Sequence, residues 1–219
     1  MMEWLGKEIF EYGKKEKTDQ VGVVTGLAYT SFGGDVLPVE VTSFEGKGRL
    51  IVTGQLGEVM KESTEIALGY VKSNAKKYNI DPKFFESNDI HIHVPEGAVP
   101  KDGPSAGITM ACALLSQITQ IPVDPFVAMT GEISLRGRVL PIGGLKEKTM
   151  AALRSGITTV LIPKDNVRDL EEIDQTVRAA LRFVTAETVD AVFAHALALP
   201  KKEAAVEHLT AIAGMERQE

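Results

Sequence analysis

The sequence is poor in cysteine and has no long apolar run, and these absences exclude several classes of protein. Cys112 is the single cysteine among 219 residues, so the chain can form neither an internal disulfide nor a multi-cysteine metal site. No stretch approaches the roughly 18 consecutive apolar residues of a membrane-spanning helix. The first residues, Met1–Trp4, lack the basic and then apolar order of a secretion signal. We therefore expect a soluble, cytoplasmic protein with no membrane partner.

The charge balance and the motifs that are missing exclude two further ligands. The chain has 24 basic and 30 acidic residues, a net charge of −6, and the basic residues are scattered. A nucleic-acid-binding segment usually carries a concentrated basic patch, so we expect no nucleic acid as ligand. No G-x-x-x-x-G-K-[ST] motif is present, so the chain has no phosphate-binding loop for ATP.

The chain divides by composition into three parts. Residues 1–18 are rich in charge and resemble a linker or the end of an upstream element, and residues 201–219 form a polar tail. Between them, residues 19–200 have enough apolar residues for one folded domain. The β-branched residues of 21–57, with turn signals at 33–35 and 45–48, predict antiparallel strands and hairpins.

After residue 57, helical and strand patterns are mixed without a regular βαβ order. The class is therefore α+β. The periodicity predicts helices over about 59–74, 105–118, 145–155 and 187–199, and strands over 89–94, 127–135, 139–142, 159–162 and 183–184.

Ser105 is the most prominent chemical feature of the chain. It lies in Gly103-Pro104-Ser105-Ala106-Gly107, between small residues and at the expected start of a helix, where backbone N–H groups lack partners. Such a serine is a candidate nucleophile beside an oxyanion site, provided that some residue takes its proton.

One candidate base is a histidine, because G-x-S-x-G also matches the nucleophile turn of α/β-hydrolases. That fold needs a strand directly before the serine and a histidine in a loop later in the chain. The segment before Ser105 has the composition of a loop. The only downstream histidines are His195, in an expected helix, and His208, in the tail. This alternative is disfavoured by both features.

Two other patterns have simpler explanations. Ser73 and Lys76 match an S-x-x-K motif, but its companion motifs are missing, and a helix surface accounts for both residues. His91 and His93 lie on one face of an expected strand, yet no third ligand occurs at a metal-binding spacing. We expect no metal site.

Several ordered motifs together resemble the proteolytic domain of the Lon proteases. The lysine and aspartate before Gly103 resemble the LonA branch, and the similarity extends from about Val21 to Pro163. The motifs are His91-Ile92-His93-Val94-Pro95-Glu96-Gly97, Pro100-Lys101-Asp102-Gly103-Pro104-Ser105-Ala106-Gly107, Thr130-Gly131-Glu132-Ile133 and Gly143-Gly144-Leu145-Lys146-Glu147-Lys148.

The resemblance implies a catalytic Ser-Lys dyad of Ser105 and Lys148, which are 43 residues apart. An ordinary lysine, with a pKa of about 10.4, is protonated at neutral pH. Burial can lower that pKa by roughly 3–5 units and so supply a neutral amine. Helical spacing puts Lys148 beside small residues and Lys146 on the opposite flank, which favours Lys148 only weakly. The resemblance decides between the two.

Four supporting residues follow from the same resemblance. Thr130 matches a threonine that hydrogen-bonds the catalytic amine, although strand propensity alone would also explain it. Asp102 matches an acid in a loop that switches between blocking and freeing the dyad, and a helix cap is the structural alternative. His93 and Glu132 match positions around the active site and at subunit contacts.

The expected function is therefore that of a serine endopeptidase domain acting on unfolded or damaged polypeptides. The resemblance implies hexameric rings and a separate ATPase module, missing from this chain, that uses ATP and magnesium. The domain itself needs no cofactor. An alternative from another class is a catalytically idle platform for ring assembly.

Overall fold

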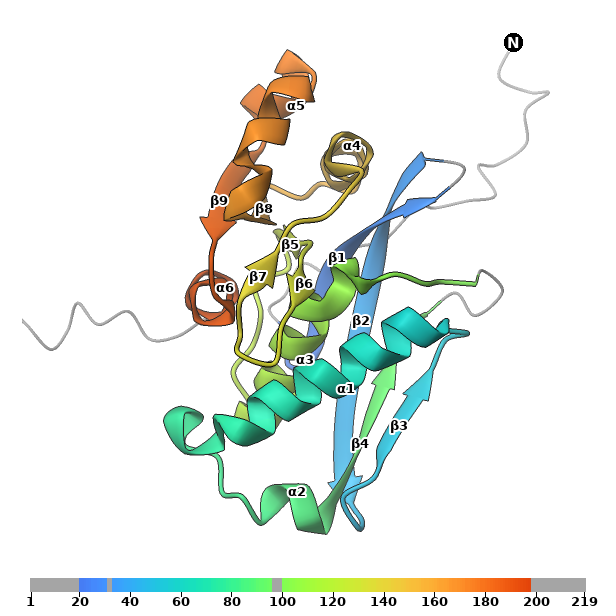
Figure 1. Cartoon of the computed structure of the whole chain (residues 1–219), viewed down its shortest axis with the longest axis vertical. Coiled ribbons are helices and arrows are strands. Elements are labelled where there is room, and N and C mark those ends of the chain that lie inside the picture. The colour runs from blue at the N-terminus through green and yellow to red at the C-terminus, as the bar shows by residue number, and fades with distance from the viewer. Residues whose placement is uncertain (1–19, 31–32, 96–99, 198–219) are drawn as a thin grey trace, which may run out of the picture.

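A seven-stranded mixed sheet forms the centre of the molecule (Figure 1). The computed structural model describes residues 20–30, 33–95 and 100–197, so the expected linker at 1–18 and tail at 201–219 lie outside the described residues. The strand order is β3-β4-β2-β1-β5-β8-β9. These strands are β1 (Val23–Thr30), β2 (Gly33–Glu45), β3 (Leu50–Thr53), β4 (Asn88–His93), β5 (Val127–Met129), β8 (Thr159–Pro163) and β9 (Arg182–Ala186).

A short hairpin and the helices complete the fold. The hairpin pairs β6 (Glu132–Ile133) with β7 (Val139–Leu140). The α-helices are α1 (Glu58–Ser73), α2 (Phe84–Ser87), α3 (Gly107–Thr119), α4 (Leu145–Arg154), α5 (Gln175–Ala180) and α6 (Val189–Ala196), and the 3₁₀ helices are η1 (Ala75–Tyr78), η2 (Pro104–Ala106) and η3 (Lys164–Glu172). No helix in the described ranges is long and apolar enough to cross a membrane.

The sheet has an antiparallel part and a parallel part. β1 pairs antiparallel with β2, and β2 with β4. β5, β8 and β9 continue from β1 as parallel neighbours. The expected class, α+β with a β-rich first half, is confirmed.

One expected pairing is wrong. The turn at residues 45–48 joins β2 to β3, but these strands do not pair, because β4 lies between them. β4 runs antiparallel to β2 and parallel to β3. A turn signal predicts a reversal of the chain and cannot show that a later strand enters the gap.

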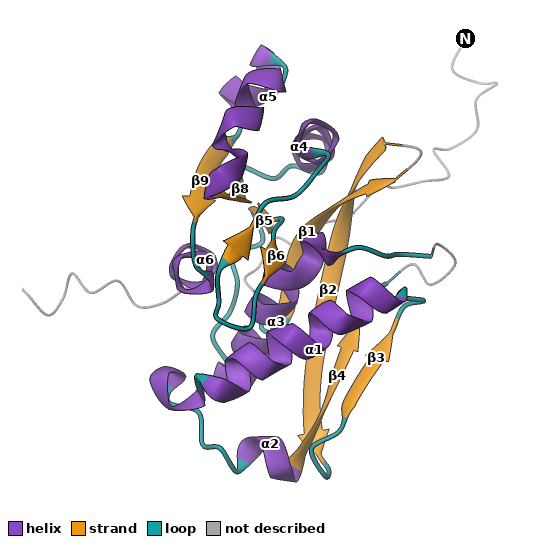
Figure 2. Ribbon diagram, in the orientation of Figure 1, coloured by secondary structure: helices purple, strands orange, loops and turns teal. Residues whose placement is uncertain are grey.

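Helices cover both faces of the sheet around β1, β5 and β8 (Figure 2). Side chains of successive strand residues point to opposite faces, so Leu161 joins the core under α3 and α6, while Val160 and Ile162 join the core under α4 and α5. α1 packs on α3 and runs across β2 and β4 in Figure 1. α3 and α4 therefore reach the same strands from opposite sides.

The expected strand at 127–135 is in fact two strands. β5 ends at Met129, and the chain resumes in β6 at Glu132. Between them Thr130 and Gly131 leave the sheet, and the Gly131 N–H donates to the carbonyl oxygen of Ser105 at 2.8 Å. The break thus brings the serine turn against the end of β5.

Asp89 holds the turn between β2 and β3 in place. Its side chain is fully buried. Oδ1 accepts hydrogen bonds from the backbone N–H groups of Lys47 and Arg49, at 2.7 and 3.0 Å, and Oδ2 accepts one from Arg49 Nε at 2.8 Å. The backbone and side-chain donors of Arg49 lower the pKa of Asp89 to about 2.

We expect Asp89→Asn to lower the urea midpoint of unfolding at pH 7, because the amide cannot accept all three hydrogen bonds. The native pKa lies below that of the unfolded carboxyl, so the stabilisation is complete above about pH 4 and lost as the pH falls to about 2. Urea titrations at pH 7 and pH 2.5 measure the change. Glu62→Gln, at an exposed site, is the control. A difference between Asp89→Asn and wild type that is as large at pH 2.5 as at pH 7 would contradict this account.

Candidate functional site

Ser105 lies in the single turn of 3₁₀ helix that leads into α3. The turn η2 runs directly into Gly107, the first residue of α3. Ser105 itself is partly exposed. Backbone N–H groups at a helix start lack helical partners and carry the positive end of the helix dipole. Ser105 is thus partly accessible at a helix start, where the Gly107 and Ile108 N–H groups already donate to the carbonyl oxygens of Pro104 and Gly131.

Lys148 is a buried lysine on the first turns of α4. Its exposed fraction is 3%, whereas Lys146, two residues earlier, is exposed. Burial lowers the pKa of Lys148 to about 8, and it is the only cause of that shift. A far larger fraction of this amine is therefore neutral near physiological pH than in an ordinary lysine.

Thr130 connects the two residues. Lys148 Nζ donates to Thr130 Oγ1 at 3.1 Å, and Thr130 Oγ1 donates to the Ser105 carbonyl oxygen at 3.5 Å. Thr130 is itself fully buried and directly follows β5. Ser105 comes from the α3 side of the sheet and Lys148 from the α4 side, so the three residues meet at the carboxyl end of β5.

The hydrogen bonds leave the amine free on one side. Within the described ranges no hydrogen bond joins Lys148 Nζ to Ser105 Oγ. A neutral amine has two N–H donors and one lone pair. One donor is directed to Thr130, which leaves the lone pair available to accept a proton.

Asp102 points to a different helix. Oδ1 accepts hydrogen bonds from the backbone N–H groups of Met60, at 3.0 Å, and of Gly103, at 2.9 Å. Met60 is in the first turn of α1, so Asp102 caps α1 and not the helix that follows it in sequence. The sequence carries no signal for this partner, because 42 residues separate Asp102 from Met60.

Within the described part of the chain, no hydrogen bond or ion pair joins His93 or Glu132 to Ser105 or Lys148. His93 Nδ1 is 2.7 Å from Thr53 Oγ1, which also lies 2.9 Å from His91 Nε2. These three residues come from β3 and β4, several strands away from β5. Glu132 is partly buried on β6, two residues beyond Thr130.

The hydrolase alternative finds no support in the geometry. Ser105 follows an irregular segment and not a strand, and His195 lies in α6. His195 Nδ1 is within 2.8 Å of its own helix, at the Ala191 carbonyl oxygen. Across the described residues no cluster of three or more His, Cys, Asp or Glu side chains could hold a metal ion.

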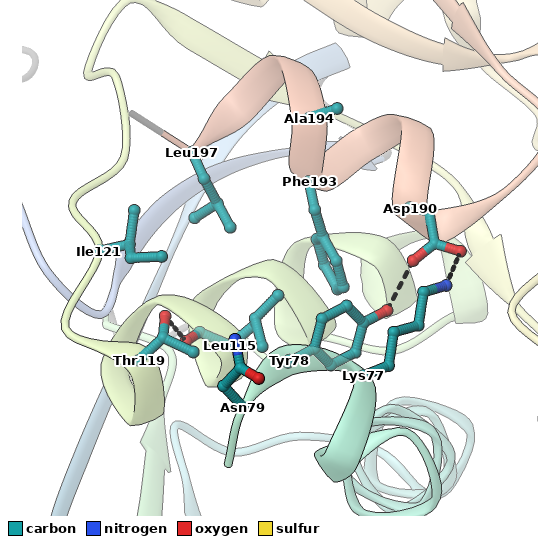
Figure 3. Close-up of a pocket in the computed structure, with 10 residues that line it drawn as sticks. All are labelled: Lys77, Tyr78, Asn79, Leu115, Thr119, Ile121, Asp190, Phe193, Ala194 and Leu197. Atoms are coloured by element: carbon teal, nitrogen blue, oxygen red, sulfur yellow. Dashed lines mark hydrogen bonds and ion pairs between the residues drawn. The ribbon is translucent and has the colours of Figure 1, made fainter. Parts of the chain in front are cut away.

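A pocket of about 350 Å³ lies between η1, α3 and α6, and none of the expected site residues lines it. Figure 3 shows Tyr78 and Lys77 of η1 converging on Asp190 of α6 at one end of this pocket. Tyr78 also packs edge to face on Phe193, with 5.6 Å between the ring centres. These contacts hold α6 to η1.

Comparison with known proteins identifies a family. Residues 1–199 match the model of the Lon protease (S16) C-terminal proteolytic domain. The chain is 61% identical over 197 residues to a Lon protease of Bacillus thuringiensis (strain Al Hakam), covering 90% of this chain and 25% of that protein. It is 63% identical over 193 residues to one of Brevibacillus choshinensis, covering 88% and 25%. Identity to Lon protease 1 of Myxococcus xanthus is 57% over 202 residues, covering 92% and 25%. The chain thus spans about a quarter of the length of these relatives.

We expect Lys148→Met to stabilise the fold at neutral pH. The native pKa of about 8 lies below the ordinary 10.5, so between these values the unfolded chain binds a proton that the folded one lacks. Wild-type stability therefore rises with pH through this window. The variant should gain up to about 3 kcal/mol in free energy of unfolding at pH 7.

Urea unfolding at pH 7 and pH 10 measures this effect, and the gain should shrink at the higher pH. Lys146→Met, on the exposed side of the same helix, should change little at either pH. A gain of the same size at both pH values would show that burial of charge is not its source.

Proposed function

Because the chain belongs to the Lon protease family, as its C-terminal proteolytic domain, we propose that it is a serine endopeptidase domain in which Ser105 is the nucleophile and neutral Lys148 is the general base. The observation that carries this proposal is the buried amine of Lys148, hydrogen-bonded to Thr130 at 3.1 Å at the end of β5, beside the Ser105 turn. With a pKa of about 8, roughly a tenth of the amine is neutral at pH 7.

The proposed reaction proceeds in two steps. Ser105 Oγ attacks the scissile carbonyl carbon while its proton passes to Lys148 Nζ, and the protonated amine then gives that proton to the leaving nitrogen. Water releases the acyl group from Ser105 with Lys148 again as base. Backbone N–H groups of the 3₁₀ turn that contains Ser105 stabilise the oxyanion. The contact between Oγ and Nζ tightens when substrate binds, as it does in many catalytic sites.

Thr130 orients the base in this scheme. Its hydroxyl proton is directed to the Ser105 carbonyl oxygen, so Oγ1 presents a lone pair to the amine. The amine then donates to Thr130 and keeps its own lone pair for the serine. The same hydroxyl couples the position of the base to the backbone of the nucleophile.

The hydrogen bonds of Asp102 support a permissive form of the proposed switch. Bonded to Met60 and Gly103, its carboxylate adds nothing to the charge around Lys148. If Asp102 instead lay beside the amine, it would hold Lys148 protonated and inactive. His93 and Glu132 are proposed to act at the rim of the site and at subunit contacts.

The remaining assignments rest on the family. We place the domain in the LonA branch, as the peptide-hydrolysing part of a cytoplasmic, ATP-dependent, hexameric protease. ATP and magnesium belong to the separate ATPase module. Substrates are unfolded polypeptides, bound as an added strand, a mode that tolerates varied side chains. Neither membrane nor nucleic acid takes part.

Peptide hydrolysis should depend on both members of the dyad and on pH. We expect Lys148→Met to lower kcat/KM about 10²–10⁴-fold and Ser105→Ala to abolish turnover. In the wild type, kcat/KM should rise with pH and level off above about 8, because the base acts only when deprotonated. An internally quenched, unstructured peptide is a suitable substrate.

Two controls separate the alternatives. Lys146→Met and His195→Ala should keep wild-type activity, and loss of activity in His195→Ala would favour a histidine base. Equal activity in wild type, Ser105→Ala and Lys148→Met would favour the idle ring-forming platform.

The isolated chain should cleave unstructured peptides weakly. This cleavage should not need ATP, because the chain lacks a phosphate-binding loop. A substrate protein offered in both its folded form and a permanently unfolded form tests this, with fragments followed by gel electrophoresis. Only the unfolded form should be cut, and ATP should have no effect. Rapid degradation of the folded form by this chain alone would contradict the proposed division of labour.

A further inference from the structure

α4, the helix that carries Lys148, lies directly on the backbone of the β1–β2 hairpin at Gly34. A methyl group added at Gly34 would lie 1.9 Å from the carbonyl oxygen of Glu147 and 2.9 Å from the backbone nitrogen of Lys148. Real side-chain carbons essentially never approach a backbone atom so closely. No residue other than glycine fits here unless the helix and the hairpin move apart.

Two further contacts fix the helix to the same part of the hairpin. The Arg154 Nη2 group, at the last turn of α4, donates to the Gly34 carbonyl oxygen at 2.8 Å. Tyr29, the partner of Gly34 across the hairpin, packs on Gly144 at the start of α4. A methyl group on Gly144 would lie 2.9 Å from Tyr29 Cγ. The N-cap, the first turn and the last turn of α4 are therefore all held against one pair of hairpin residues.

We propose that Gly34 is a positioning residue of the dyad: its lack of a side chain sets the depth at which α4 lies on the hairpin, and thereby places the Lys148 amine against Thr130 and out of water. This inference builds on the proposed role of Lys148 as base. Separating α4 from the hairpin would draw the amine away from Thr130 and let water reach it.

Burial, and not a neighbouring charge, is what this contact controls. β1, β2, η3 and α5 pack against α4. Their titratable groups include Tyr29 on β1, Asp35 on β2, Asp169 on η3 and Arg178 on α5, and none contributes to the lowered pKa of Lys148. Asp35 and Asp169 accept hydrogen bonds elsewhere, from Val36 N–H and the Asn166 amide. A shift in the Lys148 pKa therefore reports a change in its burial.

The test is a titration of Lys148 in the full chain with Gly34→Ala. In protein labelled with ¹³C-lysine, the Cε resonance that Lys148→Met removes is that of Lys148, and its pH dependence gives the pKa without any activity assay. We expect the wild type to titrate near 8 and Gly34→Ala to titrate about one unit higher, toward the ordinary value. The acidic limb of kcat/KM against pH should move by the same amount.

Gly143→Ala is the matched control. Gly143 lies just before α4, is exposed, and has nothing within 4 Å of an added methyl group. The Gly143→Ala variant should leave the Lys148 pKa unchanged. Should Gly34→Ala fail to fold, Arg154→Gln, at an exposed site, removes the hydrogen bond to Gly34 and should raise the pKa by a smaller amount.

The outcomes separate this inference from the proposed function. If Gly34→Ala folds and its Lys148 pKa is unchanged, the positioning role is overturned and the proposed function stays intact. If Gly34→Ala does not fold, an unchanged Lys148 pKa in Arg154→Gln has the same meaning. A Lys148 pKa that rises while kcat/KM keeps its wild-type pH profile refutes Lys148 as base and leaves the positioning role of Gly34 standing.

Discussion

Burial of one amine without a charged partner is the constraint on which the rest of the site depends. A lysine at this depth is unfavourable for folding when charged, and among the described residues the Thr130 hydroxyl is the one hydrogen-bond partner of its amine. The absence of a charged partner also keeps the pKa of the amine low, because an ion pair would hold the amine protonated. In the proposed mechanism, the fold thus gives up stability at neutral pH in order to keep a base available.

The sheet determines where Lys148, the proposed base, meets Ser105, the proposed nucleophile. α3 and α4 pack on opposite faces of the sheet around β1 and β5. Residues from both faces can therefore meet at the carboxyl end of β5. Thr130 is the first residue beyond that edge, within reach of the helix start on one side and of the lysine on the other. Sites at the carboxyl ends of parallel strands are common, because loops and helix starts converge there.

Local patterns in the sequence predicted much of the fold, and long-range contacts account for what they missed. The alternation of Ile90, Ile92 and Val94 identified β4 correctly, but nothing in it indicated that β4 enters between β2 and β3. The strand expected over 127–135 is broken at Thr130 and Gly131 by a contact with Ser105, which is 26 residues from Gly131. Helical spacing gave only a weak reason to prefer Lys148 over Lys146 as the buried lysine, because burial depends on which other elements pack against the helix. The resemblance of the motifs to the Lon family named Lys148, which the structure shows to be the buried one of the two lysines, while the cap that Asp102 forms on α1 had no local sign at all.

The bond from Asp102 to the start of α1 links the loop before the nucleophile to a helix that carries no proposed catalytic residue. One carboxylate cannot cap α1 and pair with a protonated Lys148 amine at the same time. Replacing a cap of this kind typically changes stability by about 1 kcal/mol, which corresponds to a factor of about five in an equilibrium between two arrangements. If Asp102 switches as proposed, loss of the cap would shift the balance between the two loop arrangements by about that factor, and a neighbouring molecule bound at the first turn of α1 would shift it from a distance.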